Sequence, residues 1–196
     1  MPTHISIPSD VTVVVLDLDG TIYRMPRMGW HMFRKNRFHL PSLIAERRWR
    51  KAWRKALNDG TKVPKKPVSE KWYKEKYLPG MVQIIADHYE QVSWLQPLLD
   101  ECKQRKIKVV VLSDYEFATD KLKALHLSPS AFDLILSTGD LGMIKPDPRL
   151  GDVLAKHLMA DTNNAAINWQ HVLFIGDRED TEGKLASALG AQFVKV

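Results

Sequence analysis

A run of apolar residues that ends at two aspartates, in the stretch 11–23, limits the folds open to this chain. The stretch reads VTVVVLDLDGTIY. Its apolar residues fill consecutive positions instead of alternating with polar ones, which is typical of a strand buried on both faces of a parallel sheet. Asp17 and Asp19 then lie at the carboxyl end of this strand and on the same side, because strand side chains alternate with a period of two. In an open α/β sheet, this end borders the crevice where ligands bind.

The aspartate pair has two interpretations. Two carboxylates this close need a cation, a shared proton or separate environments, because like charges oppose joint ionisation. Gly20 lets the chain turn away without a side chain over the pair. By itself, however, the pair is equally compatible with an acidic turn that closes a core strand.

The composition indicates a globular protein without a membrane span. The 196 residues, 44% hydrophobic and 27% charged, can form one domain with an inserted module. No apolar run approaches the roughly 20 residues of a membrane helix, and the N-terminal stretch lacks the pattern of a secretory signal. Cys102 is the only cysteine, which excludes an internal disulfide and a cysteine-based zinc site. We therefore expect a cytoplasmic protein with no membrane partner.

The net charge of +6 is unevenly distributed along the chain. Residues 24–94 carry 17 Lys and Arg against 6 Asp and Glu, a net charge of +11, whereas the remainder has a net charge of −5. Within this basic stretch, apolar spacing predicts helices at 43–57 and 81–89, and one or two helical turns at 70–77 that end at Leu78-Pro79-Gly80. We predict a basic, all-helical insert at 24–94 in a body formed by residues 1–23 and 95–196.

Strands alternate with helices in the predicted body. Further buried strands are predicted at 107–112, 132–136, 172–175 and 192–196. Helices are predicted at 95–106, 116–125, 149–159 and 181–189. Strands that alternate with helix-length connections predict a parallel sheet with right-handed crossovers. The fold class is therefore α/β, a doubly wound parallel sheet with a small helical insert.

Polar residues follow the later strands as they follow the first. Ser113 and Asp177 come at strand ends, and Lys145 lies in the loop after the third strand. Taken singly, Ser113 and Asp177 are explained as residues that favour a helix N-terminus, and Lys145 as a solvated lysine. Gathered at one edge of the sheet, they form with the aspartate pair a set that suits Mg²⁺ and an anionic substrate.

Four segments together resemble the motifs of the haloacid dehalogenase-like hydrolase superfamily, in the family's order. They are Asp17-Leu18-Asp19-Gly20-Thr21, Ser113, Lys145-Pro146-Asp147-Pro148 and Gly176-Asp177-Arg178-Glu179-Asp180. The resemblance covers nearly everything outside 24–94. It implies a Rossmann-like core with a cap inserted between the first and second motifs.

The resemblance also implies a magnesium-dependent phosphatase that hydrolyses a phosphomonoester through an aspartyl-phosphate. Asp17 would be the nucleophile, and Asp19 the general acid and base. Ser113 would bind the phosphoryl oxygens, and Lys145 would offset charge in the transition state. The Asp17 carboxylate, the Asp19 carbonyl and Asp177 would bind Mg²⁺. The acid at position 19 favours a phosphatase over a dehalogenase, because a halide leaving group needs no proton.

Residues around the motifs are expected to contact the substrate or to support the ligands: Gly20, Thr21, Asp114 and Asp180. Tyr23 and Arg24, just after the first motif, are further candidates for substrate contact, although the interpretation we favour does not place them there. Two positions depart from the family's pattern. Glu182 stands where aspartate is common, and its longer side chain could still orient water. Asp114 stands where asparagine is common, and a further negative charge beside a phosphate site is unexpected.

The basic insert leaves the substrate class open. Its helix 43–57 interleaves Arg and Lys with Trp49 and Trp53, a combination that suits nucleic acid. The interpretation we favour is that both tryptophans are core residues and the charges form a solvated face. We expect a small phosphorylated metabolite or nucleotide as substrate. The alternatives are a nucleic-acid-binding module on a hydrolase scaffold and a polynucleotide phosphatase, and a positive insert would attract anions in each case.

Overall fold

The computed structural model describes residues 4–36, 39–159 and 166–196. Within these residues, five strands form one parallel sheet in the order β3-β2-β1-β4-β5. Their bounds are β1 Val13–Leu16, β2 Lys108–Ser113, β3 Leu134–Ser137, β4 Val172–Gly176 and β5 Gln192–Lys195. β1 is the central strand, where Val15 pairs with Val110 on one side and with Phe174 on the other. The prediction of an α/β fold with a parallel sheet is confirmed.

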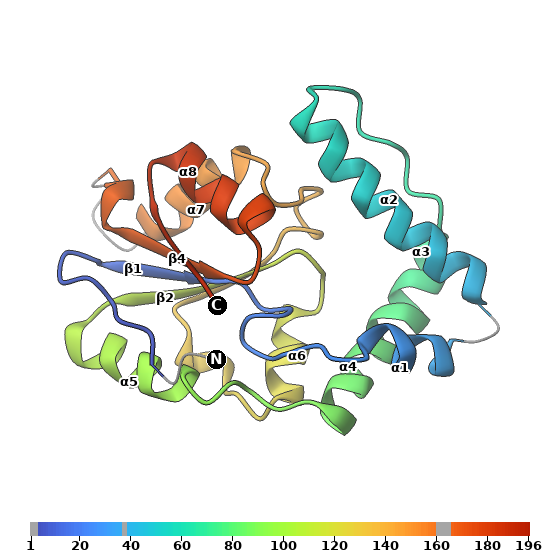
Figure 1. Ribbon diagram of the computed structural model, residues 1–196, viewed down its shortest axis with the longest axis horizontal. Helices are drawn as coiled ribbons and strands as arrows, with labels where there is room; N and C mark the ends of the chain where they lie inside the picture. Colours follow the sequence, from blue (N-terminus) through green and yellow to red (C-terminus); the bar gives the residue numbers. More distant parts are fainter. Residues whose placement is uncertain (1–3, 37–38, 160–165) are drawn as a thin grey trace.

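Helices cover both faces of this sheet, with α7 and α8 on one face and α5 and α6 on the other (Figure 1). Their bounds are α5 Leu95–Arg105, α6 Ala118–Ala124, α7 Arg149–Met159 and α8 Lys184–Leu189. The described part of the body also contains three short helical segments: η3 Pro129–Ala131, η4 Trp169–His171 and the π-helix η5 Glu179–Gly183.

The side chains of β1 divide between two apolar cores. Val13 and Val15 belong to the cluster that contains the buried residues of α7 and α8, and Val14 and Leu16 belong to the cluster with α5 and α6. Each such fully buried aliphatic side chain stabilises the fold by about 1.5–3 kcal/mol relative to an exposed one. A strand buried on both faces is thereby fixed at the centre of the sheet, and its carboxyl end is fixed with it.

The stretch 24–94 is helical wherever the structure describes it as regular, and its helices lie beside the sheet (Figure 1). Its elements are α1 Met28–Lys35, α2 Leu40–Asn58, α3 Glu70–Trp72, the π-helix η2 Tyr73–Tyr77 and α4 Leu78–His88. The assignment of 24–94 to a domain of its own stays a prediction. No helix within the described residues is both long enough and apolar enough to cross a membrane.

The predicted helix end at Leu78-Pro79-Gly80 is wrong, because helical structure continues from residue 70 to residue 88. Pro79 falls in the first turn of α4, where a missing N–H group is tolerated. The π-helix before it supplies a wider hydrogen bond, from the Leu78 N–H to the Tyr73 carbonyl. Leu78 and Met81 are buried, so tertiary packing favours the continued helix over a break.

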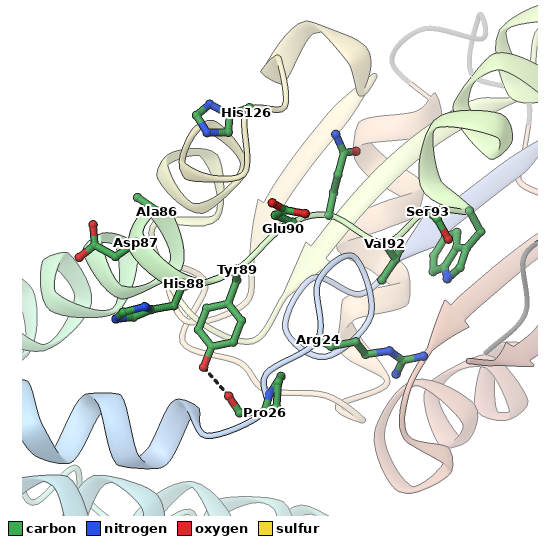
Figure 2. A pocket seen from close by; sticks show the side chains of 12 residues that line it. Arg24, Pro26, Ala86, Asp87, His88, Tyr89, Glu90, Val92, Ser93 and His126 are labelled. Atoms are coloured by element: carbon green, nitrogen blue, oxygen red, sulfur yellow. Dashed lines mark hydrogen bonds between the residues drawn. The ribbon is translucent and has the colours of Figure 1, made fainter.

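The chain crosses between the body and the helices 28–88 twice, after β1 and before α5, and the two crossings lie against each other. Tyr23 forms an isolated antiparallel bridge with Gln91. In Figure 2, the Tyr89 hydroxyl of the second crossing points to the Pro26 carbonyl of the first, with an oxygen–oxygen distance of 2.6 Å. A cavity of about 600 Å³ lies between these crossings. Arg24 lines it, but Asp17, Asp19 and Asp177 do not.

Candidate active site

The first motif positions the Asp17 carboxylate directly after β1. The Asp17 N–H donates to the Ile175 carbonyl at 3.0 Å, which extends the pairing of β1 with β4 by one residue. The Lys145 ammonium donates to Asp17 Oδ1 at 2.5 Å, and the Thr21 hydroxyl donates to Asp17 Oδ2 at 2.8 Å. Asp17 is only 6% exposed. Both of its carboxylate oxygens are therefore held in fixed directions at the edge of the sheet.

Two glycines let the motifs approach each other. Gly20 has a φ of +101°, and a Cβ atom there would lie 2.6 Å from Asp177 Oδ2. A Cβ atom on Gly176, the last residue of β4, would lie 2.5 Å from Cγ of Glu182. Any side chain at either position would collide with an acidic residue, so both glycines are needed to bring the carboxylates together.

Three carboxylates converge at the ends of β1 and β4. Asp17, Asp177 and Glu182 each offer an oxygen atom, and within the described residues these atoms lie within 4.8 Å of one another. The Lys145 ammonium also lies 2.7 Å from Glu182 Oε1. Sequence reasoning treated Glu182 only as a departure from the motif and did not count it as a ligand.

Asp180, expected beside the site, is exposed and outside this group. Its carboxylate instead accepts from the Arg178 guanidinium, at 2.6 Å to Oδ2. Both residues lie at the start of the helical turn after β4, and Glu182 is the residue of that turn that points back over Gly176.

The three carboxylates carry more negative charge than Lys145 can balance. Burial raises the pKa of Asp17 to about 7; the Lys145 charge opposes this rise, and the Glu182 charge adds to it. Burial also raises the pKa of Asp177, and Glu182 again adds to the effect. A divalent cation would relieve this repulsion, and oxygen atoms from carboxylates are the ligands that Mg²⁺ prefers. The residues present therefore fit the cation that the family resemblance implies.

The Asp19 carboxylate is held apart from this group by a different lysine. Lys121 Nζ lies 2.7 Å from both Asp19 oxygens, the Ser113 hydroxyl donates to Oδ2 at 3.1 Å, and the Tyr23 hydroxyl donates to Oδ1. Burial acts to raise the pKa of Asp19, but Lys121 and these hydrogen bonds outweigh it and lower the pKa. Tyr23, a candidate for substrate contact, thus supports Asp19, whereas Arg24 lies at the cavity between the crossings.

Lys121 was missed by sequence reasoning, although the sequence holds a signal for it. Ala118, Leu122 and Leu125 are the buried residues of α6 and its end, and Lys121 occupies the remaining position of their helical stripe. A lysine at a stripe position indicates a buried charge that requires an acidic partner.

Asp114 is neutralised by contacts from both sides of the site. Its Oδ1 atom accepts from the Lys145 backbone N–H at 2.9 Å and from the Thr138 hydroxyl at 3.2 Å, and its Oδ2 atom accepts from Arg54 at 2.7 Å. Burial acts to raise the pKa of Asp114, and the charges of Lys145 and Arg54 lower it overall. Its charge is thus directed at Arg54 of α2.

A cavity of about 240 Å³ lies between these strand ends and α2. The body contributes a mainly acidic wall, formed by Arg178 and five carboxylates, Asp17, Asp19, Asp114, Asp177 and Glu182. From α2 come three arginines, Arg47, Arg50 and Arg54. The cavity is the size of a small molecule rather than of a polymer, and its two walls have opposite charge.

Arg50 joins α2 to the segment that follows β2. Its guanidinium donates to the Asp114 carbonyl at 2.9 Å and to the Tyr73 hydroxyl at 2.6 Å, and it pairs with Glu46. The Tyr73 hydroxyl in turn donates to Glu116 Oε2 at 2.7 Å. Arg50 is 4% exposed, so these contacts, and not solvent, satisfy its charge.

The two tryptophans of α2 pack within the helical part. Trp53 is 7% exposed, the Trp49 indole N–H donates to the Pro64 carbonyl at 2.7 Å, and the two rings lie 4.9 Å apart. They lie against each other and against the segment that follows α2. Trp53 is buried as predicted, whereas Trp49 is half-buried, and Arg50 of the same helix is buried, so the charges of α2 do not all form a solvated face.

Comparison with known proteins gives one family and a shared fold. The family model described as haloacid dehalogenase-like hydrolase matches residues 11–190. No significant match is found among curated protein sequences.

Solved structures with the same fold include a protein from Haemophilus somnus described as a predicted phosphoglycolate phosphatase, with a TM-score of 0.66 and 16% identity over 95% of this chain and 85% of that chain. CbbY from Rhodobacter sphaeroides in complex with phosphate has a TM-score of 0.64 and 15% identity over 93% of this chain and 84% of that chain. A phosphatase from Thermococcus onnurineus has a TM-score of 0.63 and 16% identity over 95% of this chain and 86% of that chain.

Proposed function

The chain belongs to the haloacid dehalogenase-like hydrolase family, and we propose that it is a magnesium-dependent phosphatase that hydrolyses a phosphomonoester through an aspartyl-phosphate. The observation that carries the proposal is the placement of Asp17. Its buried carboxylate is held between Lys145 and Thr21 at the edge of a small cavity whose opposite wall is lined by arginines.

The reaction has two steps. An oxygen atom of Asp17 bonds to phosphorus while the bond from phosphorus to the leaving oxygen breaks, and Asp19 gives that oxygen a proton. Water then attacks the phosphorus of the aspartyl-phosphate, gives a proton to Asp19 and releases phosphate and free Asp17. Ser113 donates to the phosphoryl oxygens, and Lys145 offsets the charge that develops on them.

The Asp17 and Asp177 carboxylates and the Asp19 carbonyl would hold Mg²⁺, as the family resemblance implies, and Glu182 would add either a ligand or an acceptor for a bound water. Bound Mg²⁺ supplies charge neutralisation for the phosphoryl oxygens.

The cavity supports a small phosphorylated metabolite or nucleotide as substrate. Its volume of about 240 Å³ suits a small molecule, and Arg47 and Arg54 provide positive charge for an anionic one. Among the similar structures, one is titled a complex with phosphate, and one is described as a phosphoglycolate phosphatase. The nucleic-acid alternatives have less support, because Trp53 is buried, and the half-buried Trp49 packs against it and donates to the Pro64 carbonyl.

A phosphate-release assay on a panel of phosphorylated metabolites, with Mg²⁺ in excess, tests the proposal. We expect Asp17→Asn to lower phosphate release from the best substrate by about 10³-fold or more, because the variant lacks the nucleophile. The matched control is Asp152→Asn, an aspartate on the exposed side of α7, which should keep full activity. Full activity in Asp17→Asn, or no release by the wild type from any compound, would show that the proposal is wrong.

Chelation tests the metal part of the proposal. EDTA should abolish phosphate release, and excess Mg²⁺ should restore it. Phosphate release that persists in EDTA would contradict the metal assignment but not the role of Asp17. Oligonucleotide binding that weakens with salt, in a protein without phosphate release, would instead favour the nucleic-acid alternative.

A further inference from the structure

Lys121 is a buried charge for which the proposed function gives no role. It is 0% exposed, and it lies on α6 at a position where the neighbouring stripe residues are apolar. Its ammonium pairs with Asp19 and lies 4.6 Å from the centre of the Tyr115 ring. Burying an ion pair is weak evidence for stability, because desolvation of both charges offsets their attraction. A lysine kept there in place of an apolar residue therefore calls for another explanation.

The contacts of Asp19 use its whole capacity as a hydrogen-bond acceptor. An ionised carboxylate offers about four acceptor positions, two on each oxygen. Oδ1 accepts from Tyr23 and Lys121, and Oδ2 accepts from Ser113 and Lys121. The donors come from the turn after β1, the end of β2 and the helix α6, so the carboxylate is fixed in three directions.

The three donors differ in how easily they can give up their hydrogen bonds to Asp19. Tyr23 is 0% exposed and packs against the Tyr89 ring, and the stem of Lys121 is enclosed in the core. The Ser113 hydroxyl, in contrast, can rotate. In the proposed reaction it donates to a phosphoryl oxygen, which releases one acceptor position on Asp19 Oδ2 for the proton of the reaction.

We propose that Lys121 is a positioning residue, which together with Tyr23 holds the Asp19 carboxyl group so that the Oδ2 atom released by Ser113 exchanges a proton with the leaving oxygen. This inference rests on the proposed function. Asp19 first takes up a proton from solvent at the Oδ2 position that Ser113 releases. The leaving oxygen keeps the electron pair of the broken bond to phosphorus and takes this proton, and the attacking water later returns one to Asp19. Lys121 acts through Asp19, whose two oxygens it contacts, and it is not among the residues that line the cavity.

Two aryl phosphates separate a positioning role from a merely structural one. The oxygen of phenyl phosphate needs a proton as it leaves, whereas 2,4-dinitrophenolate departs without one. General acid catalysis contributes about 10²–10⁴-fold, so Lys121→Met should lower kcat/KM for phenyl phosphate by about 10²-fold and leave kcat/KM for 2,4-dinitrophenyl phosphate within about threefold. The matched control is Lys123→Met on the exposed side of α6, which should change neither.

Two further variants test whether Lys121 acts through Asp19. Asp19→Asn should show the same leaving-group pattern, and adding Lys121→Met to it should cause no further loss if Lys121 acts through Asp19. Tyr23→Phe removes one hydroxyl from a packed ring, and it carries the test if Lys121→Met does not fold by circular dichroism. It should show a smaller loss that is again confined to phenyl phosphate.

Equal losses on both compounds, or no loss on either, would overturn the role of Lys121 while the proposed function stands. A wild-type protein that hydrolyses neither these compounds nor the metabolite panel would overturn the proposed function, and the inference with it.

Discussion

Lys145 is the residue on which the contacts of the site converge. Its ammonium donates to Asp17 and to the Leu112 carbonyl at 2.9 Å, and it pairs with Glu182. Burial acts to lower the pKa of Lys145, but the charges of Asp17 and Glu182 outweigh it and raise the pKa. The site thus holds one permanent positive charge against three carboxylates, and this imbalance sets how it responds to cations and to pH.

Gly20→Ala should abolish the stabilisation by Mg²⁺ that the proposed metal site predicts. A φ of +101° strains an alanine by about 1–3 kcal/mol, and its Cβ atom would displace the Asp177 carboxylate, 2.6 Å away. Gly142→Ala is the matched control, because Gly142 also has a positive φ of +65° but has open space around it. Both variants should lower the melting temperature, and only Gly20→Ala should lose the increase that Mg²⁺ gives. An undiminished Mg²⁺ effect in Gly20→Ala would contradict the assignment of Asp177.

Stabilisation by Mg²⁺ should grow with pH. Between the ordinary carboxyl pKa of 3.8 and the raised pKa of about 7, folded Asp17 binds a proton that the unfolded chain does not. Without a cation, proton binding by Asp17 therefore makes the free energy of unfolding fall as the pH rises between these two pKa values. A cation needs the ionised form, so its stabilising effect increases as the proton leaves.

Thermal unfolding in Mg²⁺ and in EDTA, at about pH 5.5 and about pH 8, measures this effect. The difference in melting temperature should be larger at the higher pH, with NaCl of equal ionic strength as the control. A difference that is the same at both pH values, or larger at the lower one, would show that Asp17 is not a ligand.

At the scale of elements, the sequence predicted what depends on local pattern. Every strand of the sheet was located, because each is a short apolar run between turn residues. The break predicted at Pro79 failed because local signals carry no information on packing, and buried Leu78 and Met81 favour a continuous helix. The helix α1 was not located individually.

The candidate site was predictable to the same extent. Asp17, Ser113, Lys145 and Asp177 come together because each lies at or beyond the carboxyl end of a strand of the same sheet. Lys121 could not be paired with Asp19 in advance, because the two residues are 102 positions apart and meet only through the packing of α6. Glu182 replaces Asp180 beside Asp177 because the turn after β4 directs its side chain over Gly176.

We expect the attachment of α2 to the body to depend on Arg50. Arg50→Met removes the cation that faces Glu46 and Glu116, and leaves both acids buried without it. Breaking such a buried network costs about 3–5 kcal/mol, which should lower the melting temperature by roughly 10 °C in a chain of this size. Arg48→Met, at an exposed position of the same helix, should change it little. Equal melting temperatures for the two variants would show that the attachment of α2 does not depend on Arg50.

At the scale of the whole molecule, charge is arranged around the cavity. The stretch 24–94 has a net charge of +11 and the rest of the chain a net charge of −5. The arginines of α2 and the carboxylates of the strand ends face each other across about 240 Å³. A phosphorylated molecule thus meets positive charge on one side, and on the other side acids that a cation would neutralise. Under the proposed function, the positive charge of the stretch 24–94 would attract small anionic substrates.

Ionic strength should therefore change the rate at which substrate binds more than the rate of the chemical steps. Mobile ions screen interactions between exposed charges beyond about 10 Å at 0.1 M salt, whereas contacts inside a cavity are screened less. Raising NaCl from about 0.05 to about 0.5 M, with Mg²⁺ in excess, should lower kcat/KM for an anionic substrate several-fold and change kcat little. Arg47→Gln should lower kcat/KM at low salt and flatten its salt dependence, because Arg47 is exposed and lines the cavity. Arg48→Gln makes the same change of charge one residue away and outside the lining, so a loss equal to that of Arg47→Gln would mean that net charge, and not the arginines at the cavity, attracts the substrate.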